Sequence, residues 1–268
     1  MPAILLFVTS QPLAIIPLSK AQIQCEIKRL SQLSKGGFDM QIMAIGAHPD
    51  DLEIFMYGLL AAAASRGDGL HLVVATDGAA GGSEPGPALA KQRAAEARAG
   101  LAELGEVQLL DLPDGDLSSA PGAASTITSL IRKTKPDLIV THAPEDYHPD
   151  HRALSRFVGD AAGFMCPVLF CDTLMGVGFI PKYYVDITPY FDAKQVAIMA
   201  HASQHPHRFA AATAIVNRFR AAQCNAPEGH YAEAYRIDSR FPFGDVRALL
   251  PAPPPFRPFY VPGSDALI

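Results

Sequence analysis

Two short segments of this 268-residue chain hold histidine and aspartate at spacings that metal chemistry uses. The first is His48–Asp51 (His-Pro-Asp-Asp), the second is His148–His151 (His-Pro-Asp-His), and each follows an apolar run. Two histidines with one carboxylate form a common catalytic zinc site whose fourth position is left for water. The repeated pattern therefore predicts a metal site built from both segments.

Each segment can turn two side chains toward one point. Proline is favoured at the first helical position, so we expect His48 and His148 near the N-caps of two helices. Asp51 and His151 lie three residues further on, and positions i and i+3 share a helical face. A lone copy would indicate only a helix N-cap, whereas two copies on parallel neighbouring strands would meet where open α/β sheets bind ligands.

A regular alternation of strands and helices must position these segments. Strands are expected at residues 41–46, 70–76, 107–110, 137–141, 168–171, 183–186 and 231–237, and helices at 51–65, 88–104, 124–133, 149–162, 188–202 and 207–220. This alternation indicates βαβ units with helices on both faces of the sheet. The sequence therefore predicts a Rossmann-like, three-layer α/β/α single domain with a mainly parallel sheet.

Three regions are expected along the chain: an N-terminal extension at 1–39, a catalytic domain at 40–240 and a Pro-rich C-terminal tail at 241–268. The first motif's strand begins only at residue 41, so we expect the core to fold without the extension. The prolines of the tail favour an extended path over a surface or a partner. The extension and the tail are also where we expect the contacts of any homo-oligomer.

Composition limits the class of partner. The chain is 49% hydrophobic and 18% charged, which is ample for a buried core. Its net charge is −5 and no basic run occurs, so we expect no nucleic acid partner. The apolar N-terminal stretch is interrupted by Pro12 and Pro17, so we expect no stable membrane insertion. Four cysteines without C-x-x-C spacing indicate free thiols and a cytoplasmic location.

The motifs resemble those of a known enzyme family. Ala47–Asp51 is similar to the first signature of the PIG-L/LmbE-like zinc-dependent N-acetylglucosamine deacetylases, and His148–His151 is similar to the second. Thr76–Gly78 resembles their loop after the second strand, and Arg93–Glu96 resembles their Arg-x-x-Glu helix. The resemblance covers residues 40–240 and implies the family's α/β fold and zinc chemistry.

The resemblance implies that His48, Asp51 and His151 bind Zn²⁺ and that Asp50 is the general base. Zinc lowers the pKa of bound water to about 7, and a nearby carboxylate can accept its proton as the hydroxide attacks an acetamide. His148 is implied to face the developing oxyanion or to pass a proton to the departing amine. The implied reaction removes the N-acetyl group from a small N-acetylglucosaminide, which would be the partner of this protein.

The other assignments are indirect. Asp150 is implied to orient a histidine. Arg93 resembles an arginine that binds sugar or aglycone hydroxyls, and Asp114 resembles a carboxylate that holds the glucosamine ring. Asp146 is expected to line the same pocket. The structural alternatives are a helix-surface pair of Arg93 with Glu96 and an ordinary turn at Asp114.

Two other functions stay open. A metal-dependent phosphoesterase normally needs more carboxylates, around two metal ions about 4 Å apart. A non-catalytic Rossmann-like nucleotide-binding module would use Asp77–Gly82 as its phosphate loop, but this segment lacks G-x-G-x-x-G and follows the second strand. Among the remaining histidines, those at 201, 205 and 207 are expected to be structural, and His142, at a strand end, could support the site.

Overall fold

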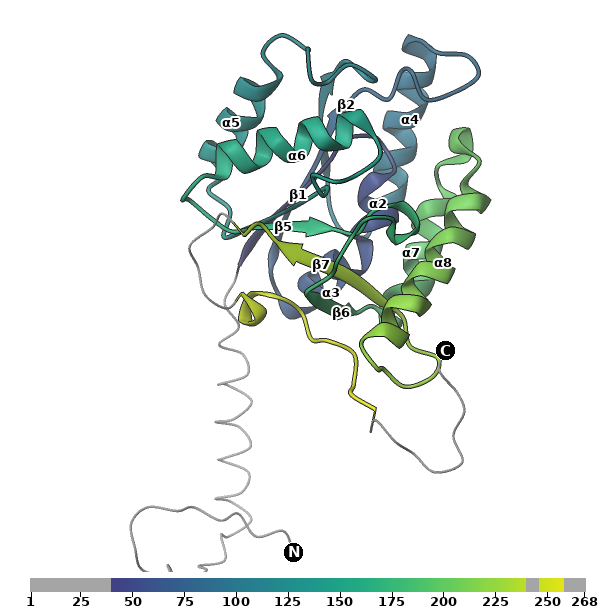
Figure 1. The fold of residues 1–268 in the computed structure, drawn as a ribbon. Coiled ribbons are helices and arrows are strands. Elements are labelled where there is room, and N and C mark those ends of the chain that lie inside the picture. The colour runs from purple at the N-terminus through teal and green to yellow at the C-terminus, as the bar shows by residue number, and fades with distance from the viewer. Residues whose placement is uncertain (1–39, 240–245, 258–268) are drawn as a thin grey trace, which may run out of the picture. The chain divides into compact units, whose positions relative to one another are not determined.

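A seven-stranded sheet runs through the part of the protein that the computed structural model describes, residues 40–239 and 246–257 (Figure 1). Its strands are β1 (Gln41–Gly46), β2 (Gly69–Thr76), β3 (Val107–Leu112), β4 (Leu138–Thr141), β5 (Val168–Cys171), β6 (Tyr183–Asp186) and β7 (Ala232–Ile237). Their order is β3-β2-β1-β4-β5-β7-β6. β7 pairs antiparallel with β5 and with β6, and all other pairs are parallel. The predicted mainly parallel sheet is confirmed.

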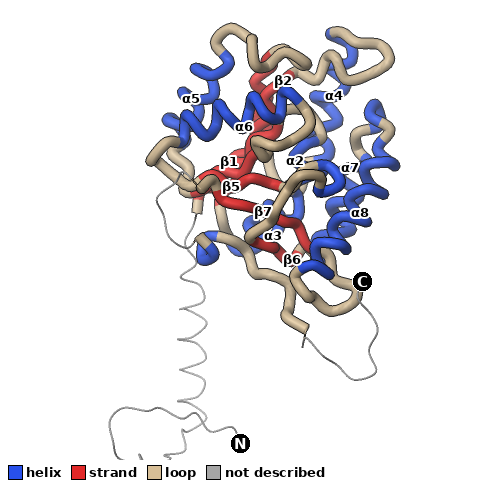
Figure 2. The backbone as a smooth tube through the Cα atoms, viewed as in Figure 1, coloured by secondary structure: helices blue, strands red, loops and turns tan. Residues whose placement is uncertain are grey.

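Helices cover both faces of this sheet, as Figure 2 shows. They are α2 (Asp51–Phe55), α3 (Tyr57–Arg66), α4 (Pro87–Gly100), α5 (Ala123–Thr134), α6 (Pro149–Ala162), α7 (Phe191–Met199) and α8 (Pro206–Gln223). Side chains of α5 and α6 pack into one buried cluster, and those of α2, α3 and α7 pack into another on the opposite face. The Rossmann-like three-layer arrangement is therefore confirmed.

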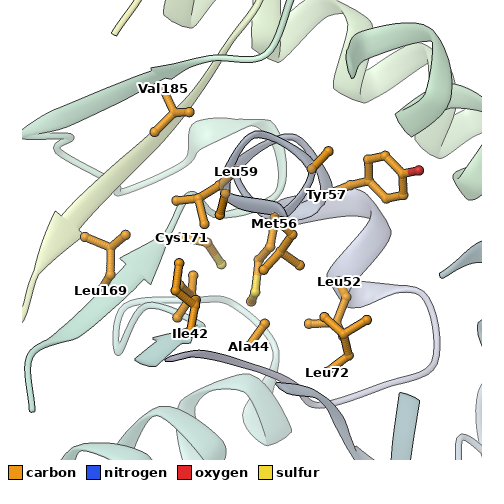
Figure 3. Close-up of a cluster of buried hydrophobic side chains, with 14 of the residues drawn as sticks. Ile42, Ala44, Leu52, Met56, Tyr57, Leu59, Leu72, Leu169, Cys171 and Val185 are labelled. Atoms are coloured by element: carbon orange, nitrogen blue, oxygen red, sulfur yellow. The ribbon is translucent and has the colours of Figure 1, made fainter. Parts of the chain in front are cut away.

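Alternate residues of the interior strand β1 supply the two clusters. Ile42 and Ala44 of β1 belong to the cluster drawn in Figure 3, which α2 and α3 complete. Met43 and Ile45 belong to the opposite cluster, with residues of α5 and α6. A strand that is buried on both faces must be apolar throughout, which explains the continuous apolar run of β1. The motif after β1 is thus anchored to the most buried part of the sheet.

The helix expected at residues 51–65 is two helices, α2 and α3, separated at Met56, whose φ is −133°. At the start of α3, the backbone N–H groups of Gly58 and Leu59 donate to the carboxylate of Glu233, at 2.9 and 2.8 Å. Because the acceptor comes from β7, 175 residues after Gly58, no local pattern could predict this interruption.

Glu233 also forms a buried ion pair with Lys194, whose Nζ lies 2.6 Å from Oε1. Removing one partner of a buried pair leaves an uncompensated charge, so Lys194→Met should lower the free energy of unfolding by about 3–5 kcal/mol in chemical denaturation. The matched control is Glu145→Gln, which breaks a partly exposed pair with Arg236 and should cost about 1 kcal/mol or less. Equal losses in the two variants would contradict this account of the core.

Much of the predicted domain organisation lies outside the described residues. The extension at 1–39 is not described, so the folding of the core without it stays a prediction. Within the tail at 241–268, residues 246–257 are described, and the carbonyl of Ala252 accepts a hydrogen bond from the backbone N–H of Asp186 on β6. In the two described ranges, no helix combines the length and apolar character needed to cross a bilayer.

Candidate active site

The turn after β1 brings an imidazole and two carboxylates to the carboxyl end of the sheet. The backbone N–H of His48 donates to Oδ2 of Asp51 at 2.7 Å. Gly46 permits this fold-back, because a Cβ there would lie 2.9 Å from the Cβ of Asp51. The helix begins at Asp51 with Asp50 as its N-cap, so His48 lies near the cap as predicted, but Pro49 is not the first helical residue. Hydrogen bonding within the turn, more than the proline, sets this helix start.

The second motif emerges beside the first, because β4 is the parallel neighbour of β1. His148 is the N-cap of α6 and Pro149 is its first residue, as predicted. The backbone N–H of Asp150 donates to Nδ1 of His148 at 3.2 Å. An imidazole that accepts at Nδ1 carries its proton on Nε2 when neutral, so His148 is held as a hydrogen-bond donor at Nε2.

The side chains of His48, Asp51 and His151 form a small triangle, in which each histidine lies near a different oxygen of Asp51. Nδ1 of His48 lies 3.2 Å from Nε2 of His151 and 3.4 Å from Oδ2 of Asp51, while Nε2 of His151 lies 3.3 Å from Oδ1 of Asp51. A tetrahedral zinc ion about 2.0–2.1 Å from each donor would hold the donors roughly 3.3–3.4 Å apart. The two histidine nitrogens therefore lie at this spacing from each other, and each lies at this spacing from one oxygen of Asp51, which is compatible with a shared metal ion.

The electrostatics of this triangle favours a cation. Burial disfavours the charged form of Asp51, but His151 and His142 outweigh it and hold the pKa of this carboxyl well below its usual range. For His151, burial acts to lower the pKa, but Asp51 and Asp146 raise it to about 9. A positive charge is thus stabilised between these side chains, as a bound proton or as a metal ion.

Two further histidines near the triangle, His148 and His142, contact other polar groups of the protein. Nδ1 of His148 accepts from Asp150, as described above. The ring of His142 stacks on that of His151 with centroids 3.7 Å apart, and its Nε2 lies 3.1 Å from the backbone N of Ala47 and 3.0 Å from Oδ2 of Asp51. His142 therefore supports the site from behind, which is the role its place at a strand end had suggested.

In each histidine of the triangle, the second ring nitrogen lies near a carboxylate oxygen. Nε2 of His48 lies 3.2 Å from Oδ1 of Asp114 and 3.3 Å from Oδ2 of Asp150. Nδ1 of His151 lies 3.1 Å from Oδ2 of Asp146. Carboxylates in such positions fix the tautomer and the ring orientation of a metal-binding histidine. Asp150 is itself held by the backbone N–H groups of residues 115 and 117, at 2.7 and 3.0 Å.

The placement of Asp146 differs from the sequence-based expectation of a pocket-lining residue. Its side chain is buried behind His151 and accepts a hydrogen bond from the backbone N–H of His148 at 2.9 Å, and it does not border the cavity. An aspartate two residues before a helix N-cap can bond back to the cap, and this local geometry turns its carboxylate inward. Asp114, by contrast, borders both His48 and the cavity.

Asp50 lies beside the triangle without belonging to it. Burial raises the pKa of its carboxyl to about 6, with Asp51 adding to this effect and Arg93 opposing it. Oδ2 of Asp50 lies 3.4 Å from a guanidinium nitrogen of Arg93. A carboxyl with a pKa near neutrality is suited to accept and return a proton at physiological pH.

A cavity of about 270 Å³ opens over these groups. His48, Asp50, Asp51, Arg93, Asp114, His148 and His151 border it. Its other walls include residues that the sequence did not single out, namely Phe55, Tyr147, Leu174, Gln204, Arg208 and Phe209. Gln204 belongs to the histidine-rich connection that was expected to be structural, and Tyr147 directly precedes His148. Their closeness in sequence to histidine motifs was the feature that could have identified these two as cavity residues. The volume suits a small-molecule ligand.

Comparison with known proteins agrees with this geometry. The family model described as "PIG-L: GlcNAc-PI de-N-acetylase" matches residues 43–162, a range that holds both motifs and all nine predicted site residues. Over these residues the chain is similar to the PIG-L family. A diacetylchitobiose deacetylase of Thermococcus kodakarensis is 28% identical over 188 residues, which span 62% of this chain and 70% of that protein.

Solved structures share the fold of this chain. The N,N'-diacetylchitobiose deacetylase of Pyrococcus horikoshii superposes with a TM-score of 0.65 at 21% identity, over 82% of this chain and 96% of that one. GalB, a 4-carboxy-2-hydroxymuconate hydratase of Pseudomonas putida, gives a TM-score of 0.66 at 22% identity, over 77% and 98%. A hydratase and a deacetylase on one fold mean that the reaction must be argued from the site.

Proposed function

We propose that this protein is a zinc-dependent de-N-acetylase that hydrolyses the acetamide of a small N-acetylglucosamine-containing saccharide or glycoside to a free amine and acetate. The observation that carries the proposal is the triangle of His48, Asp51 and His151 donors with edges of 3.2–3.4 Å, bordered by a carboxylate that is not part of it. The family match and the similarity to a diacetylchitobiose deacetylase support the same chemistry.

In the proposed hydrolysis, each residue of the site has a separate role. Zinc, when bound, would polarise the acetamide carbonyl and acidify water. Asp50 accepts a proton from the water whose oxygen attacks the acetyl carbon. His148 presents its Nε2–H to the oxygen that gains negative charge. As the C–N bond breaks, the nitrogen takes up the proton that Asp50 accepted from water, and acetate and the amine leave.

The surrounding carboxylates hold this arrangement. We infer that Asp150 and Asp146 orient the two ligand histidines, since each lies within 3.3 Å of a ring nitrogen that faces away from the metal position. Asp114 borders the cavity and His48 at once, so in this proposal it can contact a sugar hydroxyl while it orients the imidazole. A cytoplasmic location stays a prediction from the thiol content of the sequence.

The competing functions differ in measurable ways. A two-metal phosphoesterase would bind two ions per chain, whereas the proposed deacetylase needs one; each of the donor clusters found among the described residues includes His48, Asp51 or His151. A hydratase such as GalB adds water without releasing acetate. Acetate release and a metal count of about one per chain therefore separate the proposed function from both.

The test is a panel of N-acetylglucosamine, N,N'-diacetylchitobiose and N-acetylglucosaminides with larger aglycones, each incubated with zinc-loaded protein. Free amine and acetate should appear in equal amounts for at least one of them and should not appear after chelation. The preferred member would identify the substrate class. No acetate from any member, with zinc bound and the chain folded, would overturn the proposal.

A further inference from the structure

Asp50 has a backbone conformation that aspartate rarely adopts. Its φ is 139° and its ψ is −19°, a region that strains any residue with a Cβ. As N-cap of α2, Asp50 makes no side-chain capping hydrogen bond that would stabilise this conformation locally. Strain of this kind persists only where surrounding structure imposes it, so contacts from elsewhere in the chain must hold Asp50.

Arg93, on α4, supplies such contacts. One terminal nitrogen, Nη2, donates to the carbonyl of Pro49 at 3.0 Å and lies 3.4 Å from Oδ2 of Asp50. The other, Nη1, donates to the carbonyl of Gly78 at 3.1 Å. The side chain is 4% exposed. A single guanidinium therefore contacts the carbonyl group of the residue before Asp50, the carboxylate of Asp50 and the loop after β2.

That loop is shaped to fit the guanidinium. A Cβ at Gly81 would lie 2.3 Å from Nη1 of Arg93, closer than real Cβ atoms come. A Cβ at Gly78, where φ is +67°, would lie 3.0 Å from Nε. Glycine at these two positions lets the backbone close around Arg93. The loop leaves this side chain little freedom to turn away from Asp50.

We propose that Arg93 is a positioning residue, which holds Asp50 in the strained geometry from which it acts as the base; this inference rests on the proposed deacetylase function. The sequence resemblance had assigned Arg93 to substrate hydroxyls. Although its side chain borders the cavity, both terminal nitrogens already donate to carbonyl groups of the protein, and Nη1 also lies 3.9 Å from Oδ2 of Asp114. The contacts with Asp50 and with the carbonyl of Pro49 are the shorter ones, so we expect the effect of Arg93 on catalysis to pass through Asp50. A lysine, which lacks the planar fork, cannot replace it fully.

The first arm of the test separates positioning from substrate binding. Arg93→Ala should lower kcat by about 100-fold, the cost typical of misplacing a reacting group, while KM stays within about 3-fold and zinc content is retained. Arg93→Lys should recover part of kcat. Arg98→Ala removes an exposed arginine of the same helix, which donates only to its own helix at Ala94, and should leave kcat and KM unchanged.

The second arm displaces the guanidinium without removing it. Gly81→Ala should also lower kcat, because the new methyl group would lie 2.3 Å from Nη1 and must displace the guanidinium. Gly82→Ala is the matched control, since its methyl group would meet only the flexible end of Leu89, and it should leave kcat unchanged. Soluble, zinc-bound Gly81→Ala protein keeps the test decisive even if Arg93→Ala fails to fold.

The third arm is a double-mutant cycle. If Arg93 acts through Asp50, then adding Arg93→Ala to Asp50→Asn should cause almost no further loss of kcat. Equal fold losses in both backgrounds, or a raised KM with kcat preserved, would show that Arg93 contacts substrate and would overturn the inference alone. A wild-type chain that releases no acetate would instead overturn the proposed function, and this inference with it.

Discussion

Alanine in place of His48, Asp51 or His151 should give a folded chain that no longer retains zinc and has only background deacetylase activity. The wild-type chain should hold about one zinc, because three closely spaced donors with oriented histidines form a site that two donors cannot replace. Elemental analysis after dialysis measures the retention, and far-UV circular dichroism checks the fold.

His207→Ala provides the control for this metal experiment. His207 is an exposed histidine on α8 that does not border the cavity, so its removal should change neither zinc content nor activity. Full retention of zinc in all three triangle variants would disprove the ligand assignment. Loss of zinc in only two of them would identify the third residue as a bystander and would direct attention to His148 or His142, the other imidazoles within reach.

Asp50→Asn should keep the zinc and much of the substrate affinity while kcat falls by about 100- to 10,000-fold, the usual cost of losing a general base. Asparagine preserves the size of the side chain and can remain beside Arg93, but its amide cannot accept the proton of water. KM should change much less than kcat. Steady-state kinetics with zinc analysis of the same protein measures both.

His148→Ala offers a second test of the division of roles. It removes the Nε2–H donor while leaving the triangle intact, so kcat should fall with zinc retained. If Asp50→Asn is active at near wild-type rate, or is inactive only because zinc has been lost, the division of the Asp50–Asp51 pair into base and ligand is wrong.

The sequence predicted the parts of this protein that local patterns control. Apolar runs bounded by turn residues placed β1 and β4 correctly, and the proline after His148 marked the start of α6. The Rossmann-like class followed from the regular alternation of these elements. Because the two motifs come after strands that pair in parallel, the first directly and the second after a short loop, their convergence could also be anticipated from the sequence.

Features that depend on distant contacts were not predictable. The antiparallel insertion of β7 between β5 and β6, and the interruption at Met56, are both set by long-range pairing, the latter through Glu233. The inward turn of Asp146 and the grip of Arg93 on Asp50 likewise depend on where side chains end in space, not on their spacing along the chain. Sequence patterns predicted that these residues belong to the site, but they did not predict which groups each side chain contacts.

The measurement that tests the central claim most directly is isotope-resolved hydrolysis of the preferred N-acetylglucosaminide in ¹⁸O-labelled water. Zinc-loaded protein should release acetate and free amine in equal amounts, with one oxygen of each acetate taken from water. Release should stop when the metal is stripped and return when zinc is added back. Acetate release at the same rate by stripped protein, or none by zinc-loaded folded protein, would contradict the account.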